Sequence, residues 1–136
     1  MGDMAKYGAV LRPENQKVAD RGNGVRTIPL VSPGCGATQL INGITMFAPG
    51  AAVGMHWHNC EESVMVIEGE AIVVVNGKEH AVKEGDTTWL PPNVPHYFRN
   101  ASRDKPMRIF WTYAAANATR TLAATGEEHP IAAEHK

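Results

Sequence analysis

Residues 50–69 have the sequence GAAVGMHWHNCEESVMVIEG and place two histidines, His56 and His58, close to Glu61 and Glu62. On a β-strand, residues two apart project from the same face, so both imidazoles should point together. Glu62 keeps the parity of His58 if the strand continues, whereas Glu61 has the opposite parity. Two imidazoles and one carboxylate on one face suit a divalent first-row metal. The stretch therefore predicts a metal site on a strand, although an HxH pair alone also occurs on strands that bind nothing.

Short β segments follow this stretch. Residues 63–67 and 71–75 are apolar runs separated by three residues around Gly69, which predicts a hairpin buried on both faces. Asn76-Gly77 favours positive φ at both turn positions and predicts a second hairpin that leads into residues 79–82. Further strands are expected at residues 25–31 (an edge strand, because it contains a proline), 39–48, 53–58, 87–90, 96–100 and 107–113. Strands at such regular spacing indicate an all-β antiparallel barrel or sandwich.

The 136 residues suit a single domain. We divide them into an N-terminal arm (residues 1–24), a β-barrel (25–114) and a C-terminal tail (115–136) that is either a short helix or a packed segment. The net charge of −1 and the mixed charges give no basic surface for nucleic acid, and no apolar run is long enough to span a membrane. The two cysteines and the absence of a leader-like start favour a reducing, cytoplasmic location.

Two longer patterns resemble the motifs of the cupin superfamily. The first, G-x5-H-x-H-x3-E-x6-G, is matched at every position from Gly50 to Gly69. The second, G-x5-P-x-G-x2-H-x3-N, runs from Gly85 to Asn100 with one departure, because Asn93 stands where the family has glycine. Asparagine is the non-glycine residue that best tolerates positive φ, so the turn can survive. The fifteen residues between the motifs are typical of small microbial cupins.

The resemblance implies a fold and a ligand set. The fold is a jelly-roll cupin barrel of six to eight strands in a single domain, with the metal inside. The ligands are His56, His58, Glu62 and His96. Four protein ligands leave one or two positions open on a metal that prefers five or six, which is the mark of a site for substrate or oxygen. Ligand chemistry permits Fe, Mn, Ni, Zn or Cu and does not choose among them.

Three functions compete. The first is a metal-dependent enzyme of oxygenase, lyase, decarboxylase or isomerase type that acts on a small polar metabolite. The second is a non-catalytic cupin that binds a small molecule through the metal, and the third is a barrel with a vestigial site. The intact ligand set disfavours the third, while the fold alone does not decide the chemistry. Resemblance to small cupins also predicts a homodimer that pairs sheet to sheet.

Side chains outside the motifs carry further expectations. Phe98 shares the parity of His96 and is expected to line the cavity, and Trp111 and Tyr113 share one face of their strand, which faces either inward or outward. Cys60 is interpreted as a small buried thiol rather than a ligand. The remaining polar candidates are expected to face solvent: Arg99, Arg108, His80, His129 and His135.

Overall fold

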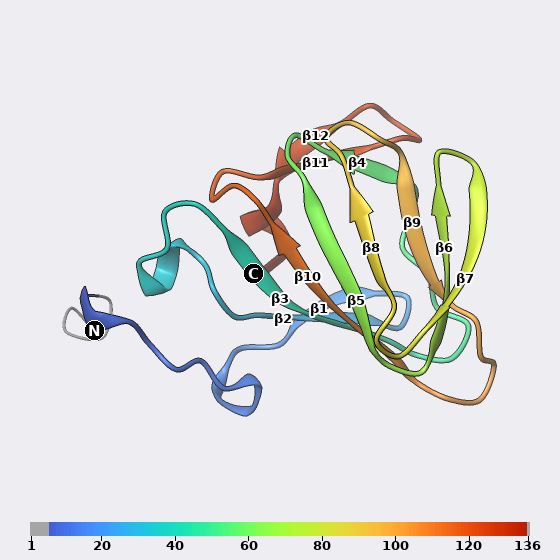
Figure 1. Cartoon of the computed structure of the whole chain (residues 1–136), viewed down its shortest axis with the longest axis horizontal. Coiled ribbons are helices and arrows are strands. Elements are labelled where there is room, and N and C mark those ends of the chain that lie inside the picture. Colours follow the sequence, from blue (N-terminus) through green and yellow to red (C-terminus); the bar gives the residue numbers. More distant parts are fainter. Residues whose placement is uncertain (1–5, 136) are drawn as a thin grey trace.

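The computed structural model describes residues 6–135, and its regular structure is almost entirely β-sheet (Figure 1). Twelve strands in these residues form two antiparallel sheets of six strands each. The first sheet contains, in spatial order, β1 (Ala19–Gly22), β2 (Val25–Pro29), β3 (Ile41–Phe47), β10 (Met107–Tyr113), β5 (Glu62–Glu68) and β8 (Thr87–Leu90). The second contains β12 (Glu128–Pro130), β11 (Thr119–Leu122), β4 (His56–His58), β9 (His96–Asn100), β6 (Glu70–Val75) and β7 (Lys78–Lys83). The expected all-β jelly-roll fold is confirmed, with twelve strands in the described residues rather than six to eight.

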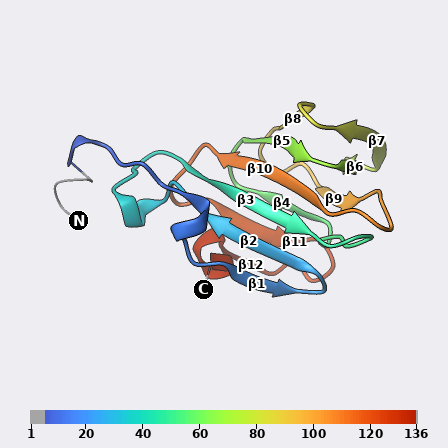
Figure 2. The same cartoon turned by 90° about the horizontal axis from the view of Figure 1, so that it is seen from below.

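The hydrophobic core lies between the inner faces of the two sheets. Strand β10 shows how the sequence builds it, because alternate side chains from Met107 to Tyr113 are buried and those between them are partly exposed. Its buried face meets Val64 of β5 and Phe47 of β3 from the same sheet, together with Phe98 of β9 from the opposite sheet. Figure 2 shows β1, β2, β3 and β10 of the first sheet side by side.

Two turns have the geometry that the sequence predicts. Asn76 and Gly77 take φ values of 50° and 83° and connect β6 to β7, where Val75 pairs with Lys78. Asn93 has a φ of 66°, so asparagine does adopt the left-handed conformation in place of the glycine of the motif. Its N–H donates a hydrogen bond of 2.8 Å to the carbonyl oxygen of His58. The loop before β9 is thereby fixed to β4.

Two strand expectations were wrong. The strand predicted at residues 25–31 is not at an edge, since β2 lies between β1 and β3; its proline, Pro29, is the last residue of the strand, where a missing N–H matters least. The run 63–67 is not buried on both faces. Met65 and Ile67 are each 40% exposed on the outer face of β5, because no layer of the described residues covers that face of β5.

The segments assigned to the arm and tail contribute to the sheets. Strand β1 falls within residues 1–24, and β11 and β12 fall within residues 115–136, where they extend the second sheet. The tail is therefore a strand pair followed by a 3₁₀ helix, η3 (Ile131–His135), rather than an α-helix. The two other 3₁₀ helices are η1 (Pro13–Asn15) and η2 (Pro33–Cys35).

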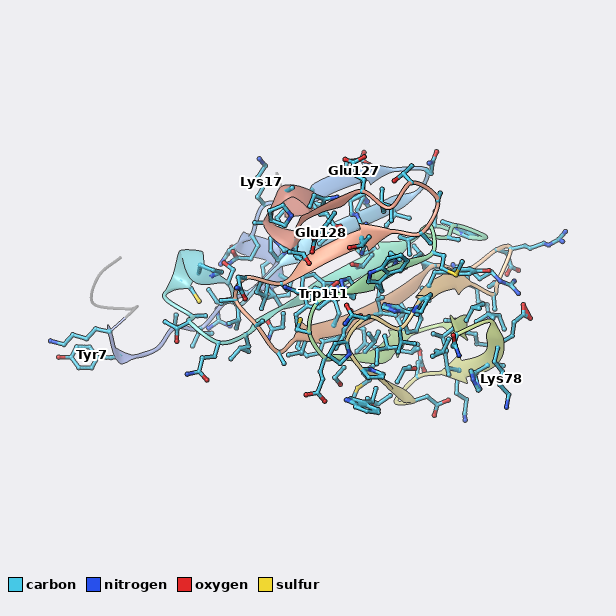
Figure 3. The ribbon with its side chains drawn as sticks, turned by 90° about the horizontal axis from the view of Figure 1, so that it is seen from above. Tyr7, Lys17, Lys78, Trp111, Glu127 and Glu128 are labelled. Atoms are coloured by element: carbon cyan, nitrogen blue, oxygen red, sulfur yellow. The ribbon has the colours of Figure 1, made fainter. Side chains whose placement is uncertain are left out.

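The described chain before β1 extends away from the barrel, with Tyr7 near its tip in Figure 3, whereas η3 lies against the barrel (Figure 1). Within residues 6–135, no helix has the length and apolar character needed to cross a bilayer. Residues 1–5 and 136 lie outside the described residues.

Candidate metal centre

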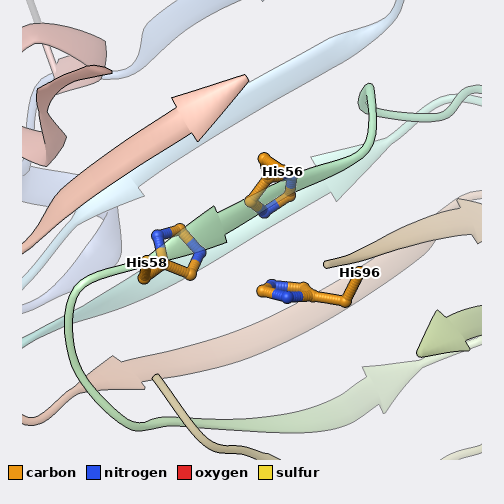
Figure 4. Close-up of side chains that lie close together, drawn as sticks. All are labelled: His56, His58 and His96. Atoms are coloured by element: carbon orange, nitrogen blue, oxygen red, sulfur yellow. The ribbon is translucent and has the colours of Figure 1, made fainter. Parts of the chain in front are cut away.

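Two neighbouring strands of the second sheet bring three histidines together (Figure 4). His56 and His58 stand two apart on β4, so both project into the interior. His96 is the first residue of β9 and pairs directly with His56 in the antiparallel register. The three residues are 4%, 2% and 2% exposed, and one ring nitrogen from each lies within 4.8 Å of the others. A single ion can therefore reach all three imidazoles.

Backbone carbonyls fix which nitrogen of each ring faces the centre. Nδ1 of His56 and Nδ1 of His96 lie 2.7 and 2.9 Å from the carbonyl oxygen two residues earlier in the chain. Nδ1 of His58 lies 3.0 Å from the carbonyl oxygen of Thr119 on β11. Because a carbonyl only accepts, Nδ1 carries the proton in each ring and Nε2 keeps its lone pair. Metal-binding histidines are oriented in this way.

Glu62, the first residue of β5, approaches the group from the first sheet. Its Oε1 lies 3.1 Å from Nε2 of His96 and 3.3 Å from Nε2 of His58. The contact with His58 is close but poorly aligned, so this Nε2 has no hydrogen-bond partner among residues 6–135. A carboxylate facing nitrogen lone pairs is favourable only with a proton or a cation between them. The structure brings the four predicted site residues together, and the unpartnered nitrogen fits a metal ion.

Burial and neighbouring charges set the protonation of the centre. Burial is the largest influence on Glu62 and would raise the pKa of its carboxyl, but contacts with His58 and His96 outweigh it and hold the pKa below its ordinary value. The pKa of His56 is lowered well below its ordinary value, first by burial and then by the charge of Arg120 and by the other two histidines. An ionised carboxylate and a neutral imidazole are the forms that bind a divalent metal.

A cavity of about 30 Å³ borders the histidine cluster. That volume holds no more than a few water molecules. Phe98, Trp111 and Tyr113 line it, so the expectation for Phe98 is confirmed and the open question about the face of β10 is settled as inward. The ring centroids of Tyr113 and His58 are 4.6 Å apart. Burial, followed by the charge of Glu62, raises the pKa of Tyr113 well above its ordinary value, so the phenol stays protonated and can donate a hydrogen bond.

Three charged residues that the sequence analysis did not single out also line this cavity: Arg21 on β1, Arg120 on β11 and Glu134 in η3. Nε of Arg120 lies 2.6 Å from Oε2 of Glu134, and a terminal nitrogen of Arg21 lies 3.6 Å from Oε1. The segments that contain these residues show no apolar periodicity, so the local sequence does not predict that they pack on the barrel. The β-branched Thr119 and Thr121 beside Arg120 were the one local indication of a strand there.

The expectation that the histidines of the tail are solvated was wrong. His135 lines the cavity and stacks on Trp111, with ring centroids 5.6 Å apart and planes at 24°. His129 has a side chain only 27% exposed, and its Nε2 lies 3.1 Å from the carboxylate of Glu134. His135 is drawn inward because η3 folds back onto β1 and β2, whereas His129 lies on β12 opposite Arg120 of β11. His80, by contrast, is exposed as expected.

The other side chains considered from the sequence lie away from the centre. Arg99 and Arg108 are both partly exposed and pair at 3.0 Å with Glu79 and Glu68, so the expectation that they face solvent is confirmed. Cys60 is a free thiol that packs against the core, and burial raises its pKa. A partly buried, protonated thiol of this kind is a packing residue rather than a metal ligand.

The chain is similar to the polyketide synthase CurC of Streptomyces cyaneus, with 30% identity over 91 residues that cover 66% of this chain and 58% of that protein. It thus spans less than two thirds of the length of that relative.

Two solved structures show the same fold. An RmlC-like cupin from Shewanella frigidimarina superposes with a TM-score of 0.69 and 25% identity, covering 77% of this chain and 88% of the other. The polyketide cyclase RemF from Streptomyces resistomycificus superposes with a TM-score of 0.71 and 17% identity, covering 90% and 84%. The family model of the cupin domain matches residues 43–113, more than half of the chain. This chain belongs to the cupin domain family.

Proposed function

We propose that this protein is a metal-dependent enzyme that acts on a small polar metabolite, with His56, His58, Glu62 and His96 as the ligands of a divalent transition metal. The supporting observation is that carbonyl oxygens engage Nδ1 of all three imidazoles, which leaves Nε2 of each ring for a metal. The Nε2 atoms of His58 and His96 also face the buried carboxylate of Glu62. Fe, Mn, Ni, Zn and Cu all accept such ligands. Four protein ligands leave room in the coordination sphere for a substrate.

The metal, when bound, supplies Lewis acidity to a coordinated substrate oxygen. Side chains of the protein orient the substrate and exclude water. The protonated phenol of Tyr113, beside His58, donates a hydrogen bond to an oxygen held at the centre. Phe98 and Trp111 line the other walls with apolar surface, which excludes water and strengthens polar contacts inside.

Membership of the cupin family is compatible with four reaction types: oxygenase, lyase, decarboxylase and isomerase. The similarity to the polyketide synthase CurC adds a second substrate class, a polyketide intermediate. The charged residues beside the cavity favour the small polar substrate, because the buried Arg120 and the partly buried Arg21 suit an anion better than a long polyketide chain.

Elemental analysis of the protein from its native host, followed by turnover assays, tests the proposal. The assays use a panel of hydroxy- and keto-acids together with an aromatic 1,3-diketone, and they monitor oxygen consumption and product. We expect stoichiometric metal, and turnover that His96→Ala abolishes and that His80→Ala, at an exposed histidine, leaves intact. Tight ligand binding without turnover would instead support a non-catalytic binding cupin, and a protein that takes up no metal would contradict both.

We also propose that two copies of the chain pair through the outer face of the first sheet. Met65, Ile67 and Trp89 are exposed there, and Phe110 extends the same face on β10 beside Met65. In a dimer with twofold symmetry, this apolar face of one copy packs against the same face of the other copy. The contact buries the apolar surface of both copies without a different partner protein. The two free cysteines are in keeping with a reducing cytoplasm, which we propose as the location.

A further inference from the structure

Buried charges next to the metal centre are not accounted for by metal binding. Arg120 on β11 pairs in register with His58 on β4, so its side chain enters the barrel beside the histidines. It is 6% exposed, and Arg21 of β1 reaches the same cavity from the first sheet. A buried guanidinium requires a partner, since an isolated charge in the interior is strongly unfavourable. Two cations therefore face one small space.

The partner of both cations is a carboxylate from η3. Glu134 lies with Oε2 2.6 Å from Nε of Arg120 and Oε1 3.6 Å from Arg21. The contact with Arg120 is close, but the Nε–H does not point at the oxygen, so this buried donor has no aligned acceptor among the described residues. Arginine forms its strongest pairs with carboxylates in a planar, two-bond geometry. Glu134 neutralises the arginines without satisfying that geometry.

The docked η3 also forms part of the cavity wall. With Glu134 and His135 in its wall, the cavity measures about 30 Å³, far below the roughly 300 Å³ or more of an ordinary ligand pocket. An organic substrate cannot enter the space beside the histidines until these side chains leave. Their departure does not break a sheet, because η3 contributes no strand to either one. Ile131, fully buried, can remain as the anchor of the segment.

We propose that Arg120 and Arg21 bind the carboxylate group of an anionic substrate, and that Glu134 occupies this anion subsite until the substrate displaces it together with the end of η3. The inference rests on the proposed function, because it names the substrate class of the same centre. A substrate carboxylate replaces that of Glu134, while the rest of the molecule fills the volume vacated by Glu134 and His135 and reaches the metal. Glu134 thus acts as an internal competitor of the substrate.

Calorimetric titration of the full chain with succinate tests the subsite without relying on turnover or on a bound metal. Succinamide, of similar size but uncharged, is the control ligand. Glu134→Gln removes the internal competitor and should tighten succinate binding by about tenfold or more, since a tethered competitor acts at a high effective concentration. The matched variant Glu127→Gln, at an exposed position of the same tail, should bind like the wild type. The double variant Arg120→Gln with Glu134→Gln should lose succinate binding.

Hydrogen exchange on the wild-type protein provides a second measurement that needs no variant to fold. Succinate should speed amide exchange in residues 132–135, and succinamide should not. The inference is overturned if Glu134→Gln binds succinate no more tightly than Glu127→Gln, if succinamide binds as well as succinate, or if exchange in η3 does not change. Metal uptake, measured on the same samples by competition with a chromophoric chelator, tests the proposed function separately. A protein that takes up no metal but binds succinate as predicted would contradict the proposed function and still support the anion subsite.

Discussion

Gly43 lies directly beneath the indole of Trp111. A Cβ atom added at Gly43 would come within 2.7 Å of Cζ2 of Trp111 and 2.6 Å of the carbonyl oxygen of Ile28. Trp111 in turn donates a hydrogen bond of 2.7 Å from Nε1 to the hydroxyl of Thr45. The absence of a side chain at Gly43 therefore makes room for Trp111, which forms one wall of the cavity.

Replacing Gly43 with alanine should destabilise the protein. The added methyl group meets a backbone oxygen on β2 that cannot move without disturbing the sheet, and overpacking of this kind typically costs about 1–3 kcal/mol. Urea unfolding followed by circular dichroism measures the change. Gly54→Ala is the matched control, because a Cβ there meets nothing within 4 Å. Equal stability of the two variants would contradict the packing argument.

Glu62→Gln should weaken metal binding by about tenfold or more, while Glu61→Gln should not. The two glutamates are neighbours in the chain, but Glu62 faces the imidazoles, whereas Glu61 is exposed and accepts a hydrogen bond from Trp89. Chelator competition at neutral pH gives the affinities. Saturating metal should also raise the melting temperature of the wild type more than that of Glu62→Gln, because binding to the folded state alone stabilises it. Equal affinities would remove Glu62 from the ligand set.

The metal-free protein should lose stability as the pH falls below about 6.5, the ordinary pKa of histidine. His56 has a lowered pKa in the fold, so below that pH the unfolded chain binds a proton that the folded protein does not. The free energy of unfolding then falls with decreasing pH. Glu62, whose pKa is also lowered, adds a further loss in the range where free carboxyls protonate. Urea midpoints between pH 8 and 5 measure the trend.

His56→Gln provides the test of the assignment. This variant has no imidazole to titrate at that position, so its stability should depend less steeply on pH between about 6.5 and 5 than that of the wild type. Parallel curves for the two proteins would show that His56 is not the group responsible. A wild type that gains stability on acidification would contradict the sign of the effect.

The motifs allowed His56, His58, Glu62 and His96 to be predicted as one group, and the structure brings them together. Parity on a strand explains the first pair, because β4 continues regularly through both. His96 lies two hairpins further along the chain and reaches the site only because β9 pairs with β4. The local sequence pattern does not determine that pairing, and the prediction of His96 as a ligand came from the resemblance to cupins.

The anion subsite shows where prediction from the sequence ended. Arg120 and Glu134 are separated from the motifs and from each other by polar segments, and single charged residues in such segments usually face solvent. Their burial arises from long-range pairing of β11 with β4 and from the return of η3 to β2. Similarly, the apolar run on β5 does not reveal that one of its faces lacks a covering layer, since an interface and a core favour the same residues.

That uncovered face provides a test of the proposed dimer. Met65 lies at its centre, opposite Phe110 on β10 and Thr87 on β8. A glutamate at position 65 would place a charge in the apolar contact, where it has no partner, so Met65→Glu should shift the protein from dimer to monomer in sedimentation velocity. His80→Glu, on the exposed strand β7 of the other sheet, should leave the dimer intact. The fold of Met65→Glu should persist, because residue 65 points away from the core. A wild type that sediments as a monomer, or a dimer unaffected by Met65→Glu, would rule out this face as the contact between copies.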